Sequence, residues 1–373
     1  MLNYLVKTIG NKKWLWFKNT NNYLQLDEAL FQVFEKLEQQ ISIDEVVNWC
    51  AQIYNLRETD ARKTVLKIDA LFSEQLKEKT QIKKEEFVYK VPDSFFSSKN
   101  YLFNDFVFHI EYGDAQIETM LHPLFAHLEI LDNESANQNL KLFFQDKTFV
   151  LNIDGKQIGI WPKNEDHIFK GQVFMALLNA TYSKTEKDWV SVLHASAIGN
   201  DKSSVLFLGD SGNGKSTASA LALASGLQLI ADDFVPIDTN GQVLAFPAAI
   251  SVKKQALEFL SLRFPELLKA KEYELKAMNK TVRYLAPQRL KNNSGRPVKA
   301  LVFIQYTQDV DFELEAIDIH LAFQHLVVDS WLSPEEKNAS FFMDWMAELP
   351  AYRLRYSNNE KMIAAIKKLL NDQ

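Results

Sequence analysis

The sequence contains a single cysteine, Cys50, among 373 residues. One thiol cannot form a disulfide within the chain, and it cannot build a metal site from several thiolates. Such sparse cysteine usage suits a reducing compartment, so we expect a cytoplasmic protein.

Long apolar runs are also missing. No segment approaches the roughly 20 apolar residues that span a bilayer, and residues 1–17 carry lysines and tryptophans where a signal peptide needs an unbroken apolar stretch. Positive charge is not in excess, because 42 Lys and Arg stand against 48 Asp and Glu, a net charge of −6. We therefore expect neither a membrane nor a nucleic acid as partner.

What is present is ordinary globular composition, with 47% hydrophobic and 24% charged residues, in a chain long enough for two or three domains. Residues 1–26 read as short strands. Asp27, Ser42 and Thr59 are expected to cap three helices that follow, Ser42 within a capping box. The lysine-rich residues 77–86 indicate a solvated linker. The first domain is thus predicted over residues 1–80.

Residues 87–186 are predicted to form a β-rich middle region. Two dipeptides, Asp146–Lys147 and Asp154–Gly155, indicate hairpin turns, and a helix is expected over residues 169–180. The region contains no catalytic constellation. Its scattered histidines are expected to be packed or exposed side chains, not ligands: His109, His122, His127 and His167.

Residues 209–217 fit the G-x-x-x-x-G-K-[ST] phosphate loop. An apolar strand over residues 204–208 precedes the loop, and a helix is expected to open just after it. Glycines let backbone N–H groups turn toward phosphate oxygens, Lys215 would reach the β- and γ-phosphates, and the Ser216 hydroxyl would hold Mg²⁺. A glycine-rich turn in an ordinary α/β domain is the alternative. The expected nucleotide-binding residues are Gly209, Asp210, Ser211, Gly212, Asn213, Gly214, Lys215, Ser216 and Thr217.

Two adjacent carboxylates, Asp232 and Asp233, follow a second apolar strand over residues 227–231. Strand, loop, helix and strand make a βαβ unit, which brings both strands' carboxyl ends to one sheet edge. One carboxylate could then hold the metal and the other could accept a proton from an attacking hydroxyl. A pair of solvated turn aspartates is the alternative.

His194 lies in a predicted strand over residues 189–198. A hairpin centred on Asp201 would place it opposite Leu208, beside the start of the phosphate loop and near the transferred phosphate. The alternative is a histidine buried in a sheet.

The combination of LHASAI, GDSGNGKST and LIADD resembles the catalytic domain of HPr kinase/phosphorylase, whose fold is shared with the phosphoenolpyruvate carboxykinases. The resemblance covers about residues 187–310. It implies that His194 matches the active-site histidine, Lys215 the phosphate-binding lysine and Ser216 a metal ligand. Asp233 matches the catalytic base and Asp232 its neighbour.

The sequence departs from that family at positions that bear on which molecule accepts the phosphate. HPr kinases usually carry a glutamate where this chain has Thr217, and their further acidic metal ligand has no counterpart in residues 245–250. A carboxykinase would need a second metal site and arginines for a dicarboxylate, which we do not find. HPr is therefore not the expected substrate, and the phosphorylase reaction is not expected.

Residues 1–77 resemble the PqqD-like peptide-recognition domain, which pairs with the leader of a precursor peptide by strand addition. A winged-helix-like accessory domain that only packs against the rest is the alternative. Some relatives of the HPr-kinase-like proteins that carry such a domain phosphorylate serine on peptides.

Toward the C-terminus we expect a core strand over residues 299–306, helices over 321–331 and 334–347, a strand over 351–356 and a final helix capped by Asn358. A loop-rich stretch carries four basic residues, Lys280, Arg283, Arg289 and Arg296. One of them could stabilise charge in phosphoryl transfer. The alternative, which we favour for any single residue, is a solvated basic surface.

These observations predict an α/β protein with a P-loop catalytic domain over residues 187–373. The expected function is an ATP-dependent, Mg²⁺-assisted kinase that phosphorylates a serine-type hydroxyl of a peptide or protein. The alternative is a nucleotide-binding peptide chaperone or scaffold with little or no kinase activity. The sequence leaves open whether the protein forms a homo-oligomer.

Overall fold

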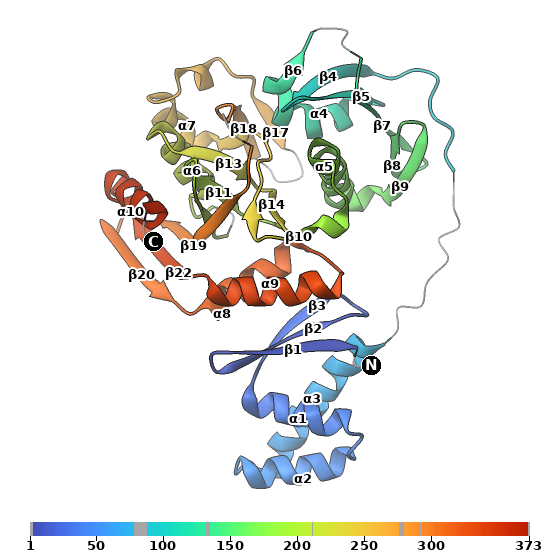
Figure 1. The fold of residues 1–373 in the computed structure, drawn as a ribbon, viewed down its shortest axis with the longest axis vertical. Helices are drawn as coiled ribbons and strands as arrows, with labels where there is room; N and C mark the ends of the chain where they lie inside the picture. Colours follow the sequence, from blue (N-terminus) through green and yellow to red (C-terminus); the bar gives the residue numbers. More distant parts are fainter. Residues whose placement is uncertain are drawn as a thin grey trace.

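The computed structural model describes residues 3–77, 88–131, 135–210, 212–275, 280–290 and 293–371. The protein is a mixed α/β structure with several sheets. In Figure 1 the N-terminal part (blue) is separated from the remainder by two helices, α8 (Ile319–Asp329) and α9 (Glu336–Glu348). No helix in these ranges combines the length and apolarity required to cross a bilayer.

The N-terminal part has the predicted order of strands followed by helices. The Ser42 capping box forms as expected, with Glu45 N–H donating to the Ser42 hydroxyl and the Glu45 carboxylate accepting from Ser42 N–H. Thr59 is not a cap, because the third helix begins at Glu58 and Arg57 takes the cap position. The elements are β1 (Tyr4–Ile9), β2 (Lys12–Phe17), β3 (Asn22–Asp27), α1 (Glu28–Glu38), α2 (Ile43–Ile53) and α3 (Glu58–Leu76).

Both faces of this small sheet are covered. Leu15 and Phe17 lie in a cluster with the three helices. On the other face, Trp14, Trp16 and Tyr23 belong to the main core of the rest of the molecule. Successive side chains of a strand point to opposite faces of the sheet. One face therefore contributes to a core within the N-terminal part, and the other to a core shared with α8 and α9.

The middle region is a six-stranded sheet in the order β6-β4-β5-β7-β8-β9. The two predicted hairpin turns are confirmed, because Gln145 pairs with Thr148 and Ile153 with Lys156, and the turn residues have positive φ as type I′ turns require. The predicted helix is part of α5 (Asp166–Tyr182). The remaining elements are β4 (Ser97–Phe103), β5 (Phe106–Tyr112), α4 (Ala115–Phe125), β6 (Glu129–Ile130), β7 (Gln138–Gln145), β8 (Thr148–Ile153) and β9 (Lys156–Pro162).

The C-terminal part is built on a ten-stranded sheet, whose main path runs β13-β11-β12-β19-β15-β14-β10-β21. Off this path, β22 pairs with β19, and β20 pairs with β22. A three-stranded sheet, β16-β18-β17, lies beside it. The elements not yet given are β10 (Trp189–Leu193), β11 (Ser196–Gly199), β12 (Ser204–Leu208), α6 (Lys215–Ala224), β13 (Gln228–Asp232), β14 (Val235–Asp238), β15 (Gln242–Val243), β16 (Ile250–Lys253), α7 (Lys254–Ser261), β17 (Tyr273–Leu275), β18 (Lys280–Leu285), β19 (Arg296–Tyr306), β20 (Phe312–Ile317), β21 (Trp331–Leu332), β22 (Ala351–Tyr356) and α10 (Asn359–Asn371).

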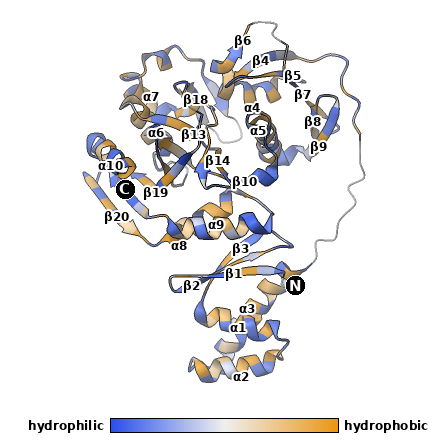
Figure 2. Ribbon diagram, in the orientation of Figure 1, coloured by the Kyte–Doolittle hydropathy of each residue, from blue (hydrophilic) through white to orange (hydrophobic). Residues whose placement is uncertain are grey.

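The predicted C-terminal strands and helices are present, but the helix expected over residues 321–331 ends at Asp329, and Trp331 lies in β21. The Asn358 cap is confirmed, because its side-chain oxygen accepts from Lys361 N–H at 3.1 Å. The stretch predicted to be loop-rich is partly wrong, because Arg283 lies in β18 and Arg296 opens β19. Figure 2 shows hydrophilic and hydrophobic residues intermixed along α9, as expected for a helix that covers core on one side.

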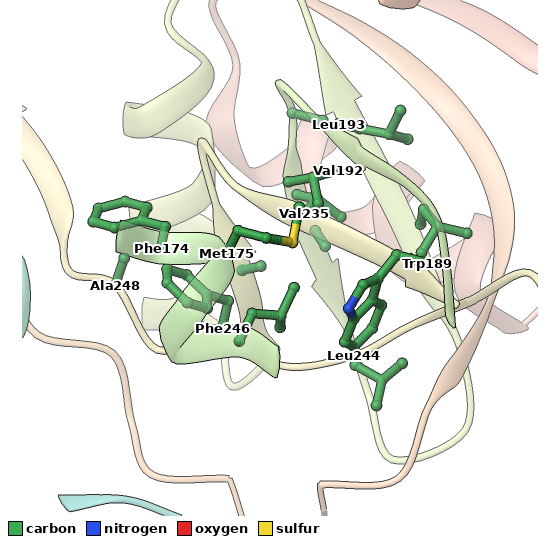
Figure 3. Packing of buried hydrophobic residues seen from close by; sticks show 14 of the residues in the cluster. Phe174, Met175, Trp189, Val192, Leu193, Val235, Leu244, Phe246 and Ala248 are labelled. Carbon is green, nitrogen blue, oxygen red and sulfur yellow. The ribbon is translucent and has the colours of Figure 1, made fainter. Parts of the chain in front are cut away.

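Helix α5 joins the middle region to the large sheet. Figure 3 shows Phe174 and Met175 of α5 against Val192 of β10 and Phe246. Phe174 also packs edge-on against Phe234 at a ring-centroid distance of 5.4 Å. Because Phe174, Met175 and Phe246 are buried and Phe234 is partly buried, α5 packs beside the turn between β13 and β14.

The contact between the N-terminal sheet and α8 contains a buried histidine, His320. Its Nδ1 lies 2.8 Å from Trp14 Nε1 and 2.7 Å from Gln25 Nε2. Since the indole N–H is only a donor, Nδ1 must accept and the imidazole is neutral. Burial lowers the pKa of His320, Lys12 lowers it further, and Asp318 opposes the shift.

We predict that acidification weakens this contact. The folded state holds a neutral His320 and binds fewer protons than the unfolded chain, so stability is lost as pH falls below about 6.5. The thermal midpoint should drop more between pH 7.5 and 5.5 in the wild type than in His320→Gln. His167→Gln, at an exposed histidine, should keep the wild-type dependence; equal drops in all three proteins would contradict the prediction.

Candidate active site

The phosphate-loop sequence joins the buried strand β12 to the helix α6, which begins at Lys215. The end of the loop is tied to β19, because Tyr306 N–H donates to the Asn213 carbonyl at 3.0 Å. Asn213 N–H in turn donates to the Asp210 carbonyl at 3.2 Å. Ser211 lies outside the described residues, so its predicted role has no structural description here.

Two loop glycines are required by close approach. Gly209 has φ +138°, and a Cβ there would lie 3.0 Å from the Ile304 carbonyl oxygen. Gly214 has φ +92°, and its Cβ would lie 3.2 Å from Tyr306 Cβ. Side chains are strained at such φ values, so the loop follows this path against β19 only with glycine at both positions.

The strands β12 and β13 deliver their carboxyl ends to one edge, as predicted. Each pairs antiparallel with β11, which lies between them. They are therefore parallel to each other, and the residues after Leu208 lie on the same side as those after Ala231. This places the phosphate loop and the two aspartates at one edge of the sheet.

The prediction of one continuous strand over residues 189–198 is wrong. The chain forms β10, then bends at His194 and Ala195, then forms β11, because the two halves pair with different neighbours. Asp233 N–H donates to the Ala195 carbonyl at 2.9 Å at this bend. The β11–β12 register, continued by one pair, puts Ala195 opposite Leu208, so the predicted register of His194 is off by one residue.

His194 is exposed at this bend, and its backbone N–H donates to the Ser330 hydroxyl at 3.1 Å. The pKa of His194 is lowered, first by partial desolvation and then by the positive charge of Lys215, while Asp233 opposes the shift. The histidine therefore shares one electrostatic environment with the loop lysine and the second aspartate.

Lys215 and Asp233 form an ion pair across the loop, with Nζ and Oδ1 separated by 3.6 Å. The lysine side chain is nearly buried, whereas the Asp233 side chain is 54% exposed. Asp233 has φ +58°, a left-handed conformation that turns the chain between β13 and β14. Its carboxylate is thus accessible from solvent while its backbone is held in place.

Asp232 faces a different environment. It is buried at the end of β13, and the Ser196 hydroxyl of the neighbouring strand donates to its carboxylate. Burial raises the pKa of Asp232, as does the charge of Asp233, while the Ser196 hydrogen bond and Lys215 lower it. The expected division between the two aspartates is therefore present, with one carboxylate buried and the other open.

Two positively charged or ionisable groups near the site escaped the sequence analysis. His325 of α8 lies 3.9 Å (Nδ1 to Oδ1) from Asp210 of the loop. Lys170 of α5 is half-buried, and burial lowers its pKa while Asp233 raises it. Among the described residues, no carboxylate lies within 4 Å of the Lys170 ammonium. Neither residue belongs to a motif, so no local signal predicts its position.

Arg296 does not approach the loop. It is buried at the opposite end of β19, where its guanidinium donates to the Asn200 carbonyl at 2.7 Å and to Gln228 Oε1 at 3.0 Å. Arg283 donates to the Leu267 and Leu268 carbonyls, both at 2.7 Å. Both guanidinium groups are engaged with backbone carbonyls, and neither contacts a described residue of the phosphate loop, so nothing here supports a catalytic role for either.

Magnesium is compatible with the donors present. Ser216 lies in the first turn of α6, and Asp232 is the last residue of β13. Hydroxyl and carboxylate oxygens are ligands that Mg²⁺ accepts, and it commonly takes its other ligands from water and phosphates. The described ranges contain no group of three or more His, Cys, Asp or Glu residues suited to a metal, so such an ion would depend on nucleotide oxygens.

Comparison with known proteins adds no assignment. No family model matches the chain, and no curated protein matches it significantly.

We predict that Gly209→Ala destabilises the protein by about 1–3 kcal/mol, because alanine is strained at this φ and its Cβ would press on β19. Gly171→Ala is the matched control. Gly171 lies inside α5 with open space around it, so alanine should add about 0.5–1 kcal/mol of stability. Urea unfolding measures both, and similar values for the two variants would contradict the prediction.

We also predict that Asp232→Asn stabilises the protein, and more so at pH 8 than at pH 5. The raised pKa means that the folded state binds more protons than the unfolded chain above about pH 3.8, so the wild type loses stability as pH rises through this window. Thermal unfolding at both pH values measures the gain.

Asp238→Asn is the control for this variant. Asp238 is also buried, but it accepts backbone N–H bonds from Asn240 and Gln242 at 2.9 and 3.0 Å. Removing its charge should weaken both bonds and lower stability. A gain for Asp232→Asn of the same size at both pH values would show that its carboxyl is not perturbed.

Proposed function

We propose that this protein is an HPr-kinase-like phosphotransferase. It transfers the γ-phosphoryl group of ATP to a serine-type hydroxyl on a peptide or protein in the cytoplasm. The observation that carries the proposal is the Lys215–Asp233 ion pair beside a loop of P-loop sequence, at the edge where β12 and β13 both end.

The loop and its lysine fit a triphosphate. Lys215 opens α6, so its ammonium and the N-terminal amides of that helix provide positive potential in one place. In the structure, the Lys215 ammonium is paired with the Asp233 carboxylate. Bound phosphates would draw it away, leaving the Asp233 carboxylate free to accept a proton.

In the proposed step, the acceptor hydroxyl oxygen attacks the γ-phosphorus. The bond from this phosphorus to the bridging oxygen breaks, ADP leaves, and the hydroxyl proton passes to Asp233. The half-exposed Asp233 carboxylate is open to an incoming side chain. His194, at the bend beside it, would orient the phosphate.

Ser216 and Asp232 are the residues that would hold Mg²⁺, Asp232 in its charged form. The ion would supply charge neutralisation of the β- and γ-phosphates. The Ser196 hydrogen bond favours the charged form of Asp232 and orients its carboxylate.

The N-terminal part would recruit the acceptor as a PqqD-like domain. Both faces of its sheet are covered, but none of the described strands pairs with the outer edge of β1 or β3. A peptide would therefore enter as an added strand at an edge, where the backbone supplies affinity.

A nucleotide-dependent peptide scaffold is the second candidate. The observation that favours it is the raised pKa of Asp232, since burial opposes the charged form that a metal ligand needs. Such a protein would bind ATP and peptide without transferring phosphate.

We predict that Lys215→Ala abolishes phosphoryl transfer and weakens ATP binding about tenfold or more, because the loop loses its charge. Asp233→Asn should keep ATP binding but lower transfer by about 100-fold or more, since the base is removed. Labelled ATP with pools of serine-containing peptides measures transfer, and calorimetry measures binding.

Lys202→Ala and Asp201→Asn are matched controls, because both residues are exposed in the turn at the opposite end of β12. They should behave as the wild type. Full transfer by Asp233→Asn would remove its assignment as base. ATP binding without transfer to any peptide would favour the scaffold.

A further inference from the structure

Helix α8 touches the N-terminal sheet at its first turns. The Trp14 indole stacks on Phe323 with ring centroids 3.7 Å apart and an interplanar angle of 22°. Its N–H donates to His320 Nδ1 at 2.8 Å. Gln25 adds a side-chain bond to Gln324 at 2.7 Å. The N-terminal part thus holds this end of α8 by a buried stack and by directional hydrogen bonds.

The second half of the same helix reaches the phosphate loop. His325 packs edge-on against Phe303 of β19, with ring centroids 5.2 Å apart, and its Nδ1 lies 3.9 Å from Asp210 Oδ1. Just beyond the helix, Ser330 accepts the backbone N–H of His194. Phe303 pairs in register with Leu208, the last residue before the loop. Three contacts therefore connect α8 to the site.

An α-helix of 11 residues is one stiff unit with 1.5 Å of rise per residue. His320 and His325 are little more than one turn apart along it. A shift of the end that Trp14 holds must displace His325, because the backbone hydrogen bonds between them do not stretch appreciably.

We infer that His325 is a positioning residue for the phosphate loop, and that the N-terminal sheet sets its position through Trp14 and α8. The inference rests on the proposed function in one respect, namely that the loop binds ATP. It goes further, because it makes the nucleotide affinity depend on the docked N-terminal part. By linkage, bound nucleotide then strengthens that docking to the same degree.

A double-mutant cycle on ATP affinity tests the inference, measured by calorimetry on the full chain with Mg²⁺ present. Trp14→Leu and His325→Leu should each weaken ATP binding about 5- to 20-fold. The double variant should be no weaker than the worse single variant, because both act through α8. His325→Gln, which keeps a polar side chain near Asp210, should restore most of the affinity.

Trp49→Leu is the matched control, since Trp49 lies on α2 against Tyr54 and Lys36, in the N-terminal part but outside the α8 contact. It should bind ATP as the wild type does. A measurement without mutation covers the case in which Trp14→Leu fails to fold. In the wild type, ATP should slow hydrogen exchange in β2, although no hydrogen bond or ion pair joins that strand to the described residues of the loop.

The outcomes separate the two claims. Wild-type affinity in Trp14→Leu, additive effects in the cycle, or unchanged exchange in β2 would each overturn the inference while leaving ATP binding intact. Failure of the wild-type chain to bind ATP would overturn the proposed function and the inference with it.

Discussion

The hydrogen bond from Asp233 N–H to the Ala195 carbonyl holds the candidate site together. It lies where two ladders meet, β10 with β14 on one side and β11 with β13 on the other. Both segments leave their strands at this point, between β10 and β11 and between β13 and β14. His194 and Asp233 lie in these two connections, and both are exposed.

The two aspartates of the site differ in burial, and their charges are therefore balanced in different ways. The open Asp233 neutralises the nearly buried Lys215, whereas Asp232 is enclosed and its carboxylate accepts hydrogen bonds from the Ser196 hydroxyl and from the backbone at Asp233. An isolated buried carboxylate is costly. In the proposed function this edge binds a cation and phosphates, so the cost in stability would be offset by a gain in activity.

The three parts of the chain meet around this edge. The middle region contributes Lys170 through α5, which Phe174 fastens to the β13–β14 turn. The N-terminal sheet contributes through α8, which lies between Trp14 and the phosphate loop. The site is therefore assembled from segments far apart in sequence, and each is anchored by buried aromatic side chains.

Local rules were enough for several features. The capping box at Ser42, the type I′ turn at Asp146–Lys147 and the glycines of the loop depend on a few neighbouring residues, so the sequence alone predicted them. The proximity of Asp232 and Asp233 to the loop also followed, because the two strands of a short βαβ unit run parallel and end at one edge. The bend at His194, the burial of Arg296 and the arrival of His325 and Lys170 did not follow. Each depends on which strands pair and which helices pack across long separations, and only the tertiary structure decides those choices.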